Sequence, residues 1–435
     1  MPRRPRRFLL IVLTAVIGVV VLSLCSNLLL DVGHSLVQEH NRHDSSGDGD
    51  EFVYRKKEVR LFVGTPFFRT PVGNAYLDNC SVREHNRHDS SGDGDEFVYR
   101  KKEVRLFVGT PFFRTPVGNA YLDNCSVRKH CKIVDDKDSS DAVLYHAPDF
   151  VLMGTLKPNQ ITVLWSLESP INHRFYQNFE RQINWTMTYR RDADVWFPYG
   201  VITKRREPIR VDFDELWKSK KKMVVWLISN CGHTNGRIEL TKALQEAGLE
   251  VDIFGACGRR PTPNDCDGVN KQGDRCVAEL FKPYMFAISF ENSLCKDYIT
   301  EKFFEVLEKR YAVPIVMQRK TYEENGAPSD SFIAVDDYQN VDNLVNNLKV
   351  IAKDKSAYLK YHQWRETFEV RSDYFNIDDT GFCQLCKKIM RQDFMPKHYD
   401  DVASWHSVGI CDQPQDGFVN KFLTNSGKKP SFQGD

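Results

Sequence analysis

The first thirty residues constrain the topology of this chain more than any other segment. Four arginines stand among the first seven residues, and an almost unbroken apolar run follows from Phe8 to Leu30. At about 1.5 Å per helical residue the run forms about 34 Å of helix, enough to cross a hydrocarbon core of about 30 Å. We therefore expect a cytoplasmic tail at 1–7, a transmembrane signal-anchor at 8–30 and a lumenal remainder, because arginines stay on the cytoplasmic side. A cleaved signal peptide is the alternative, but the run is long and lacks a convincing cleavage site.

Cysteines and composition agree with a lumenal body. The chain has 12 cysteines, and disulfides persist only in oxidising compartments. Three Asn-x-Ser/Thr sequons, each weak evidence alone, make Asn79, Asn124 and Asn184 candidate N-glycosylation sites. The formal net charge of +1 argues against a nucleic-acid partner, which usually requires a basic surface.

An internal repeat divides the segment after the anchor. Residues 39–83 and 84–128 are letter-for-letter identical. Two copies that never recur are not a solenoid, whose repeats diverge and number three or more. We interpret them as a recent tandem duplication or as an error in assembling the coding sequence. Without the duplicated Cys80 the cysteines after the anchor become even in number, as full pairing requires. The second copy runs directly into the rest of the chain, so Val104–Phe113 is the expected first strand and the first copy belongs to a stem at 31–100.

The body alternates short apolar runs with helical patterns. The runs are rich in Val, Ile, Phe and Trp and are bounded by turn residues, which is typical of buried parallel strands. Such alternation predicts an α/β fold with two Rossmann-like domains facing a cleft, at 101–217 and 218–371, and a C-terminal tail at 372–435. The charged segment Lys218–Lys222 separates the two domains. The expected strands are Ala142–His146, Ile161–Leu167, Asp194–Pro198, Met223–Ser229, Val251–Phe254, Tyr284–Phe290, Val313–Met317 and Phe332–Val335, and the expected helices include Arg237–Ala247 and Thr300–Lys309.

The densest group of polar residues lies in FAISFENSLCKDYITEK, residues 286–302. An apolar strand ends at Phe290, and Thr300 is placed to cap a helix that begins with Glu301 and Lys302. Ligands of open α/β sheets gather at strand ends and phosphates at helix N-termini, so a lysine here suits a diphosphate. From spacing alone, an ordinary strand-to-helix turn with a capping threonine is the more economical interpretation. No GxGxxG or Walker loop occurs, which disfavours dinucleotide enzymes and P-loop ATPases.

Four ordered blocks resemble the α1,3-fucosyltransferases of glycosyltransferase family 10. FENSLCKDYITEKFFEVL resembles the signature block of that family, and the other three blocks are similar to family segments in the family's order. The resemblance covers roughly Leu106 to Cys386. It implies a GT-B type fold, in which the N-terminal half binds the acceptor and the C-terminal half binds GDP-fucose. The other three blocks are WSLESP at 165–170, INWTMTYRRDADVWFPYG at 183–200 and SNCGHTNGRIELTKAL at 229–244.

The resemblance also implies roles for single residues. Arg237 and Lys302 resemble the cations that hold the donor diphosphate, where prearranged positive charge stabilises the departing GDP. Glu301 resembles the carboxylate near the ribose and the fucose. Asn292 and Tyr298 resemble donor-site residues.

Glu168 matches the proposed general base of the family. An inverting transfer to a sugar hydroxyl needs one carboxylate opposite the leaving group, to accept the proton of the acceptor as the oxocarbenium-like carbon is attacked. The alternative is an exposed carboxylate in a turn after a strand.

Two further motifs suggest metal or redox chemistry. Asp192-Ala193-Asp194 is a DxD sequence, which chelates Mn²⁺ in other glycosyltransferases, but it stands in the block assigned to the other domain. We favour a structural role for it, pairing with Arg190 or Arg191. Cys383-x-x-Cys386 reads as half a zinc site or a redox pair, but no second such pair accompanies it. The resemblance instead implies disulfides from these two cysteines back to Cys125 and Cys131.

Taken together, the residues and the resemblance predict a Golgi membrane enzyme of type II topology. It would transfer fucose in α1,3 linkage to N-acetylglucosamine of a glycan, either the N-glycan core or a lactosamine arm. GDP-fucose would be the donor, no cofactor would be tightly bound and no metal site is assigned, although Mn²⁺ is a candidate activator. The alternatives are a non-catalytic sugar-binding or scaffold protein on the same fold, and a transferase that uses another nucleotide sugar.

Overall fold

The structure is a computed structural model that describes residues 101–150, 154–173, 181–232, 235–258, 275–392, 397–412 and 417–428. All of them belong to the unit Asn86–Asp435. The predicted tail, anchor and stem, with the sequon at Asn79, lie outside the described residues. Among the residues that are described, no helix combines the length and the apolar character that a membrane crossing requires.

The first sheet has six parallel strands in the order β2-β1-β3-β4-β5-β6. Its central strands are buried along nearly their whole length, which explains their continuous apolar sequences. The first strand lies in the second copy of the repeat, as predicted, but it ends at Val108 rather than at Phe113, and β3 has the predicted bounds. The strands are β1 Val104–Val108, β2 Cys131–Ile133, β3 Ala142–His146, β4 Ile161–Ser166, β5 Trp185–Thr188 and β6 Val195–Trp196.

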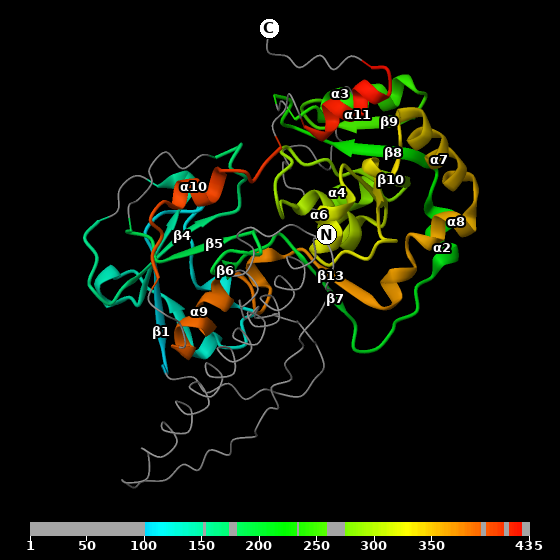
Figure 1. Cartoon of the computed structure of the whole chain (residues 1–435). Helices are drawn as coiled ribbons and strands as arrows, with labels where there is room; N and C mark the ends of the chain where they lie inside the picture. The colour runs from blue at the N-terminus through cyan, green and yellow to red at the C-terminus, as the bar shows by residue number, and fades with distance from the viewer. Residues whose placement is uncertain are drawn as a thin grey trace, which may run out of the picture. The chain divides into compact units, whose positions relative to one another are not determined.

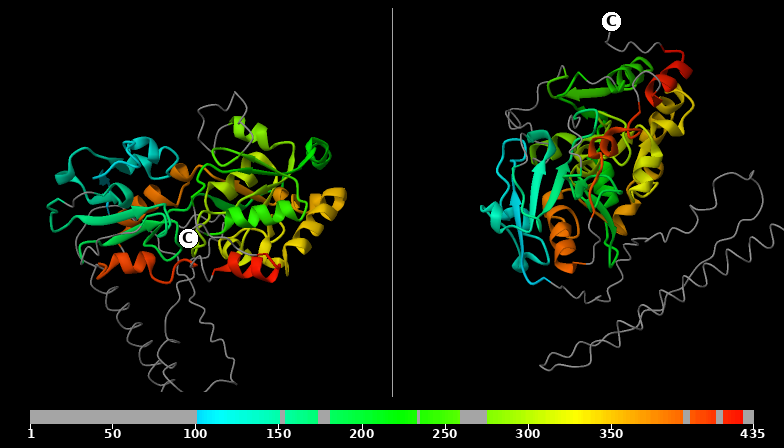
Figure 2. Two further views of the ribbon diagram at one scale, coloured as in Figure 1. Left: turned by 90° about the horizontal axis from the view of Figure 1, so that it is seen from above. Right: turned by 60° about the vertical axis from the view of Figure 1, so that its left-hand side comes forward.

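The second sheet has five parallel strands in the order β12-β11-β10-β8-β9. All of the strands predicted for this half are present, and β9 has the predicted bounds. The two sheets lie in separate halves of the described chain, which we call the N-terminal and C-terminal halves (Figures 1 and 2). The strands are β8 Lys222–Leu227, β9 Val251–Phe254, β10 Tyr284–Ile288, β11 Val313–Val316 and β12 Ile333–Ala334.

Helices cover both sheets, and two further strands form an antiparallel ribbon, β7 Val201–Lys204 with β13 Phe368–Arg371. The predicted helix Thr300–Lys309 is a short α-helix that continues as a π-helical turn, Val306–Arg310. The α-helices are α2 Phe213–Ser219, α3 Arg237–Glu246, α4 Arg275–Phe281, α5 Glu301–Glu305, α6 Arg319–Glu324, α7 Val341–Lys353, α8 Lys355–Lys360, α9 Gly381–Arg391, α10 Val402–Ser407 and α11 Phe418–Asn425. The 3₁₀ turns are Asn119–Leu122, Arg128–His130, Lys137–Ser139, Ala147–Asp149, Val335–Asp337, Gln363–Glu366 and Tyr374–Asn376.

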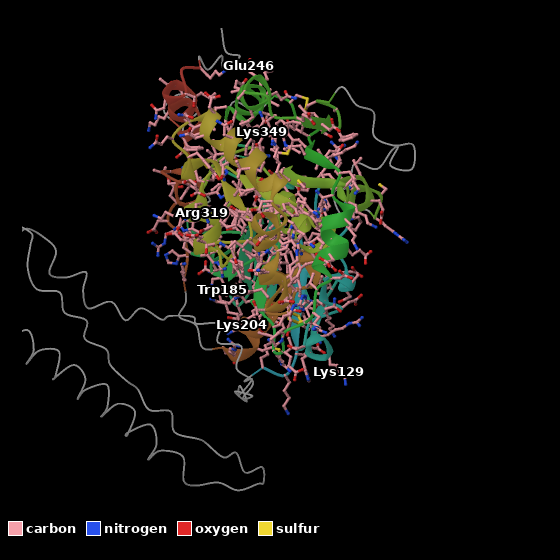
Figure 3. All side chains as sticks on the ribbon, turned by 90° about the vertical axis from the view of Figure 1, so that its right-hand side faces the viewer. Lys129, Trp185, Lys204, Glu246, Arg319 and Lys349 are labelled. Carbon is pink, nitrogen blue, oxygen red and sulfur yellow. A yellow bond between two sulfur atoms is a disulfide. The ribbon has the colours of Figure 1, made fainter. Side chains whose placement is uncertain are left out.

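The C-terminal tail contacts both halves: its packing on the N-terminal half was expected, and its packing on the C-terminal half is an addition. Helix α9 contacts β1 and β6, and Lys388 lies 5.0 Å from the ring centroid of Trp185 in β5 (Trp185 is labelled in Figure 3). Helix α11 packs on α3 (Figure 1), and Lys428 beyond its end pairs with Glu246, which is labelled in Figure 3. This additional contact follows from the apolar face of α11, which is buried in the same cluster as the apolar residues of α3.

One hydrophobic core runs through both halves. Trp165 and Phe197 of the first half and Phe303 and Phe304 of α5 belong to the same buried cluster. The backbone at Gly200 lies close to the ring of Phe304, since a Cβ at this position would lie 2.4 Å from Cγ of Phe304. The glycine of the FPYG sequence therefore allows α5 to pack against the N-terminal half.

Candidate active site

The topology of the second sheet selects the place where its ligand should bind. From β8 the chain adds β9 on one side and β10 on the other, so the strand order reverses between β8 and β10. Open α/β sheets bind ligands outside the carboxyl ends of the strands at such a switch point. The loop after β8 leads to Arg237, and the segment after β10 contains Glu291 and Asn292. The structure thus brings the predicted donor residues of both segments to one sheet edge.

Arg237 is the first residue of α3 and is buried beside the end of β10. Its Nη2 donates to the carbonyl of Asn230 at 2.6 Å and its Nη1 to the carbonyl of Phe290 at 3.5 Å. Its buried Nε has no hydrogen-bond partner among the described residues. Burial lowers the pKa of Arg237, an effect that Glu291 opposes. A buried guanidinium without an ion-pair partner among those residues can accept an anion.

Glu291 organises the second cationic residue. Its carboxylate accepts hydrogen bonds of 2.8 Å from the backbone N–H and the hydroxyl of Thr300, the N-cap of α5. Lys302 lies 3.4 Å from the same carboxylate and donates to Glu301 at 3.0 Å and to the Thr300 hydroxyl at 2.8 Å. The Lys302 ammonium is therefore held at the N-terminus of α5, where the helix dipole adds to its charge.

These charges are strongly coupled. Burial disfavours the charged form of Lys302, but Glu301 and Glu291 raise its pKa above the ordinary range. Burial acts to raise the pKa of Glu301, but Lys302 lowers it on balance, while burial raises the pKa of Glu291 despite the same lysine. Lys302 and Glu301 are therefore charged at neutral pH, and the lysine can present positive charge to an incoming phosphate.

Glu168 follows the carboxyl end of β4 in the other half and faces the donor segment. Its Oε2 accepts hydrogen bonds from Nδ2 of Asn172 at 3.2 Å and from the hydroxyl of Tyr298 at 3.4 Å. Burial raises the pKa of Glu168, which the Asn172 hydrogen bond and the charge of Lys302 partly oppose. This carboxylate is therefore not the exposed turn residue of the alternative interpretation. A raised pKa and a fixed orientation suit a general base.

The remaining donor candidates lie on the same segment. Tyr298 is buried and contacts Tyr189 edge-on, with ring centroids 4.9 Å apart. Asn292 is half-buried and accepts a hydrogen bond from the hydroxyl of Ser293, whose oxygen lies 2.6 Å from the hydroxyl oxygen of Ser169. The contact between the two serines and the contact between Glu168 and Tyr298 therefore connect the general-base candidate to the donor segment.

A disulfide fastens the donor segment to the C-terminal tail. Cys295 is bonded to Cys411, and the backbone of Lys296 and Leu294 exchanges hydrogen bonds of 2.8 Å with Ile410 and Asp412. A cavity of about 110 Å³ lies beside this disulfide and is lined by residues that include Glu291 and Tyr298. A larger cavity of about 480 Å³ between α3 and β9 is lined by none of the predicted site residues, so we place the site by its charged groups.

The structure assigns structural roles to the carboxylates of the DxD sequence. Asp192 receives two hydrogen bonds from Arg190, at 2.8 and 2.6 Å. Asp194 accepts hydrogen bonds from Thr186 and Tyr399. Both carboxylates thus already have partners within the fold, the first of them the arginine that the sequence suggested.

The disulfides that the resemblance implied are present. Cys125 is bonded to Cys383 and Cys131 to Cys386, so the CxxC sequence is neither a redox pair nor a zinc ligand. The oxidised thiols also explain why Cys125, Asp378 and Cys383, which lie close together, do not form a metal site. A further disulfide joins Cys231, in the loop that leads to Arg237, to Cys257, which follows β9.

The two described sequons differ in their surroundings. Asn124 is exposed. Asn184 donates from Nδ2 to the carbonyl of Lys397 at 2.9 Å and accepts at Oδ1 from the backbone of Thr162 at 2.8 Å, and Thr186 of its sequon is buried. A glycan on the Asn184 nitrogen would break the first bond, so the fold disfavours this candidate. Sequon spacing carries no information on burial, which is why the sequence could not separate the two.

Sequence reasoning missed two residues of the site. Glu291 directly follows the expected strand end at Phe290 but was assigned no role, although its carboxylate holds both Thr300 and Lys302. Sequence reasoning also missed Asn172, which orients Glu168 from four residues further along the chain. A carboxylate directly after a buried strand was a usable signal for Glu291. No comparable pattern marks Asn172, because its role depends on a local turn.

Comparison with known proteins agrees with this geometry. Residues 100–200 match the family described as "Fucosyltransferase, N-terminal", and residues 217–405 match "Glycosyltransferase family 10 (fucosyltransferase) C-term". Alpha-(1,3)-fucosyltransferase fut-6 of Caenorhabditis elegans is 43% identical over 295 residues, which cover 65% of this chain and 74% of that protein. Alpha-(1,3)-fucosyltransferase fut-5 of the same organism is 33% identical over 92% of this chain and 96% of its own length.

A solved structure of an alpha1,3-fucosyltransferase with GDP-fucose overlaps 70% of this chain and 96% of its own, with a TM-score of 0.45 and 14% identity. That likeness is too distant to transfer residue roles. The family matches and the two long alignments are sufficient by themselves: this chain belongs to glycosyltransferase family 10 and is a fucosyltransferase.

Proposed function

We propose that the enzyme transfers L-fucose from GDP-β-L-fucose, with inversion, in α1,3 linkage to N-acetylglucosamine of a glycan. The N-glycan core and a lactosamine arm are the two acceptors that we consider. The C-terminal half would hold the donor and the N-terminal half the acceptor, in the manner of a GT-B enzyme. The names of fut-6 and fut-5 support the linkage. The buried Arg237 and the half-buried Lys302 at the edge of the second sheet support a nucleoside diphosphate donor.

One observation carries this proposal. A half-buried carboxylate in the N-terminal half, Glu168, is hydrogen-bonded to Tyr298 of the segment that also carries Lys302. The general-base candidate therefore lies against the donor segment, and we propose that the bound fucose has Glu168 on one face and the cationic residues on the other. An inverting displacement needs this arrangement, with the base on the face of the sugar opposite the leaving group.

The chemistry follows from the positions of these residues. The acceptor hydroxyl oxygen attacks C1 of fucose while the bond from C1 to the diphosphate oxygen breaks, and Glu168 takes the hydroxyl proton. Arg237 and Lys302 stabilise the negative charge that accumulates on GDP, and they do so most strongly in the transition state. Glu301 keeps Lys302 in place and lies where a hydroxyl of the ribose or the fucose could donate to it. Mn²⁺ stays a candidate activator, with no residue assigned to hold it.

Replacement of the base tests the proposal. Glu168→Gln preserves the size of the side chain and its hydrogen bonds to Asn172 and Tyr298, but it removes the proton acceptor. We expect transfer of labelled fucose to a glycan panel to fall by about 10²- to 10⁴-fold. GDP-fucose should still raise the thermal midpoint of the variant as it does for the wild type.

The other nucleotide sugars provide the control. Stabilisation by UDP- or CMP-sugars in place of GDP-fucose would show that the enzyme uses another donor. Binding of GDP-fucose by a wild-type protein that transfers to no glycan would favour a sugar-binding protein on this fold, and absence of donor binding would sink the proposal. The panel also identifies the acceptor.

We further propose that the enzyme is a type II protein of the Golgi membrane. The apolar run at 8–30 and the disulfides of the described residues support an anchor followed by a lumenal body. Protease treatment of sealed microsomes tests the topology. Digestion of the catalytic body without detergent would contradict it.

A further inference from the structure

A strained turn stands at the carboxyl edge of the first sheet. Phe112 and Thr115 exchange backbone hydrogen bonds of 2.8 and 2.9 Å, and the two residues between them, Phe113 and Arg114, have φ values of 44° and 65°. Two-residue turns with positive φ at both positions usually hold Asn-Gly or Asp-Gly, because other side chains are strained there. The chain therefore keeps a bulky aromatic residue where the backbone favours glycine.

The strained turn exposes the aromatic ring of Phe113. The Phe113 side chain is 48% exposed, among the most exposed large apolar side chains of the described residues. Strained backbone that the surrounding structure holds in place is concentrated at functional sites. A phenylalanine without a function would destabilise the fold less at a position whose φ is negative.

Buried groups hold the turn in position. Oδ2 of Asp149 accepts a hydrogen bond of 2.7 Å from the backbone N–H of Phe113 and lies 2.7 Å from Nδ1 of His146, which is fully buried. The His146 ring lies edge-on to Phe113, with centroids 4.8 Å apart, and Phe112 stacks on Trp165 at 5.1 Å. The ring of Phe113 thus rests on a rigid support and loses little conformational freedom when a ligand binds.

The turn also occupies the switch point of the first sheet. From β1 the chain adds β2 on one side and β3 on the other, so the strand order reverses between β1 and β3. The turn follows β1, and His146 ends β3 opposite Trp165 of β4. Glu168 comes three residues after that tryptophan along the chain. The same topological rule that places the donor site in the second sheet places a ligand of the first sheet beside this turn.

We propose that Phe113 is an acceptor-binding residue, whose ring stacks on the apolar C–H face of a pyranose in the acceptor glycan. The inference rests on the proposed function and deepens it. Sugars present a flat apolar face that an exposed ring can cover, while their hydroxyls remain free for polar contacts. The support beneath the ring sets its distance from the strand that leads to Glu168, so the turn helps to choose which acceptor hydroxyl reaches the base.

Substitution of Phe113 by glycine separates ligand binding from stability. In the full-length enzyme, Phe113→Gly removes the ring but relieves the strained φ, so the thermal midpoint should stay the same or rise. We expect the KM for the acceptor glycan to rise about tenfold, with a smaller change in kcat and in the KM for GDP-fucose. Phe113→Tyr keeps the stacking surface and should restore most of the acceptor affinity.

The repeat supplies a matched control. Phe68 is the equivalent of Phe113 in the first copy of the duplicated segment and has the same sequence neighbours. We expect Phe68→Gly to leave every kinetic constant unchanged. An unchanged acceptor KM in Phe113→Gly would overturn the inference, and so would a lower thermal midpoint with kcat and both KM values affected alike, because that pattern indicates a structural role. If the wild type binds no GDP-fucose, the proposed function fails first and this inference falls with it.

Discussion

The two carboxylate oxygens of Glu168 are not equivalent. Both hydrogen bonds, from Asn172 and from Tyr298, reach Oε2. Oε1 is therefore the oxygen that we expect to take the proton. Burial raises the pKa of this group, and the Asn172 hydrogen bond stabilises its charged form and partly offsets the rise. In the proposed mechanism Asn172 is thus a positioning residue that also sets the pH range in which the base works.

This balance predicts a pH dependence. The base acts only when ionised, so kcat/KM should fall as the pH drops through a pKa that lies above the ordinary value of 4.5 for glutamate. Asn172→Ala removes a hydrogen bond to the charged form, which raises the pKa further and moves the acid limb to higher pH. Measurement of kcat/KM against pH for the wild type and for Asn172→Ala tests the expected shift of the acid limb. Asn343→Ala, on the exposed surface of α7, is the control. A limb that moves to lower pH, or stays in place, would contradict the assignment.

At the scale of elements, the sequence predicted what depends on local pattern. The strands β3 and β9 have the predicted bounds because each is a short, mostly apolar run between turn residues. The ribbon of β7 and β13 was not predicted, because neither strand is apolar and its pairing joins Val201–Lys204 with Phe368–Arg371 far along the chain. The π-helical turn after α5 also escaped prediction, because its helical periodicity resembles that of an α-helix.

Gly200 offers a test of how the two halves pack. Gly200→Ala places a Cβ within 2.4 Å of the buried Phe304 ring, so α5 or the FPYG strand end must shift. We expect a loss of about 1–3 kcal/mol in the free energy of unfolding, and a lower kcat because α5 begins with Glu301 and Lys302. Denaturant unfolding measures the first effect. Gly118→Ala is the matched control, since nothing lies within 4 Å of its added Cβ. Equal stability of the two variants would show that the contact is easily relieved.

At the scale of the whole molecule, the proposed site draws its residues from both sheets. Each sheet reverses its strand order once, and the candidate residues follow strands at or beside these points: the Phe113 turn and Glu168 in one half, Arg237 and the segment at 290–302 in the other. The tail reinforces this assembly through Cys295–Cys411 at the donor segment and through Cys125–Cys383 and Cys131–Cys386 at the first sheet. Its contact with both halves could not be predicted, because a helix such as α11 carries an apolar face but no mark of its partner.

The duplication allows the assignment of the first strand to be tested inside one molecule. Leu106 of β1 is fully buried, and Leu61 stands at the same position of the first copy. If the second copy supplies β1 and the first belongs to the stem, Leu106→Ala should cost about 2–5 kcal/mol of stability, while Leu61→Ala should cost almost nothing. Thermal unfolding and fucose transfer of the two variants measure this directly. Because both substitutions have identical sequence neighbours, a difference between them reports only which copy is folded into the sheet. Equal losses in both variants would mean that the first copy is also packed in a core, and the stem assignment would then be wrong.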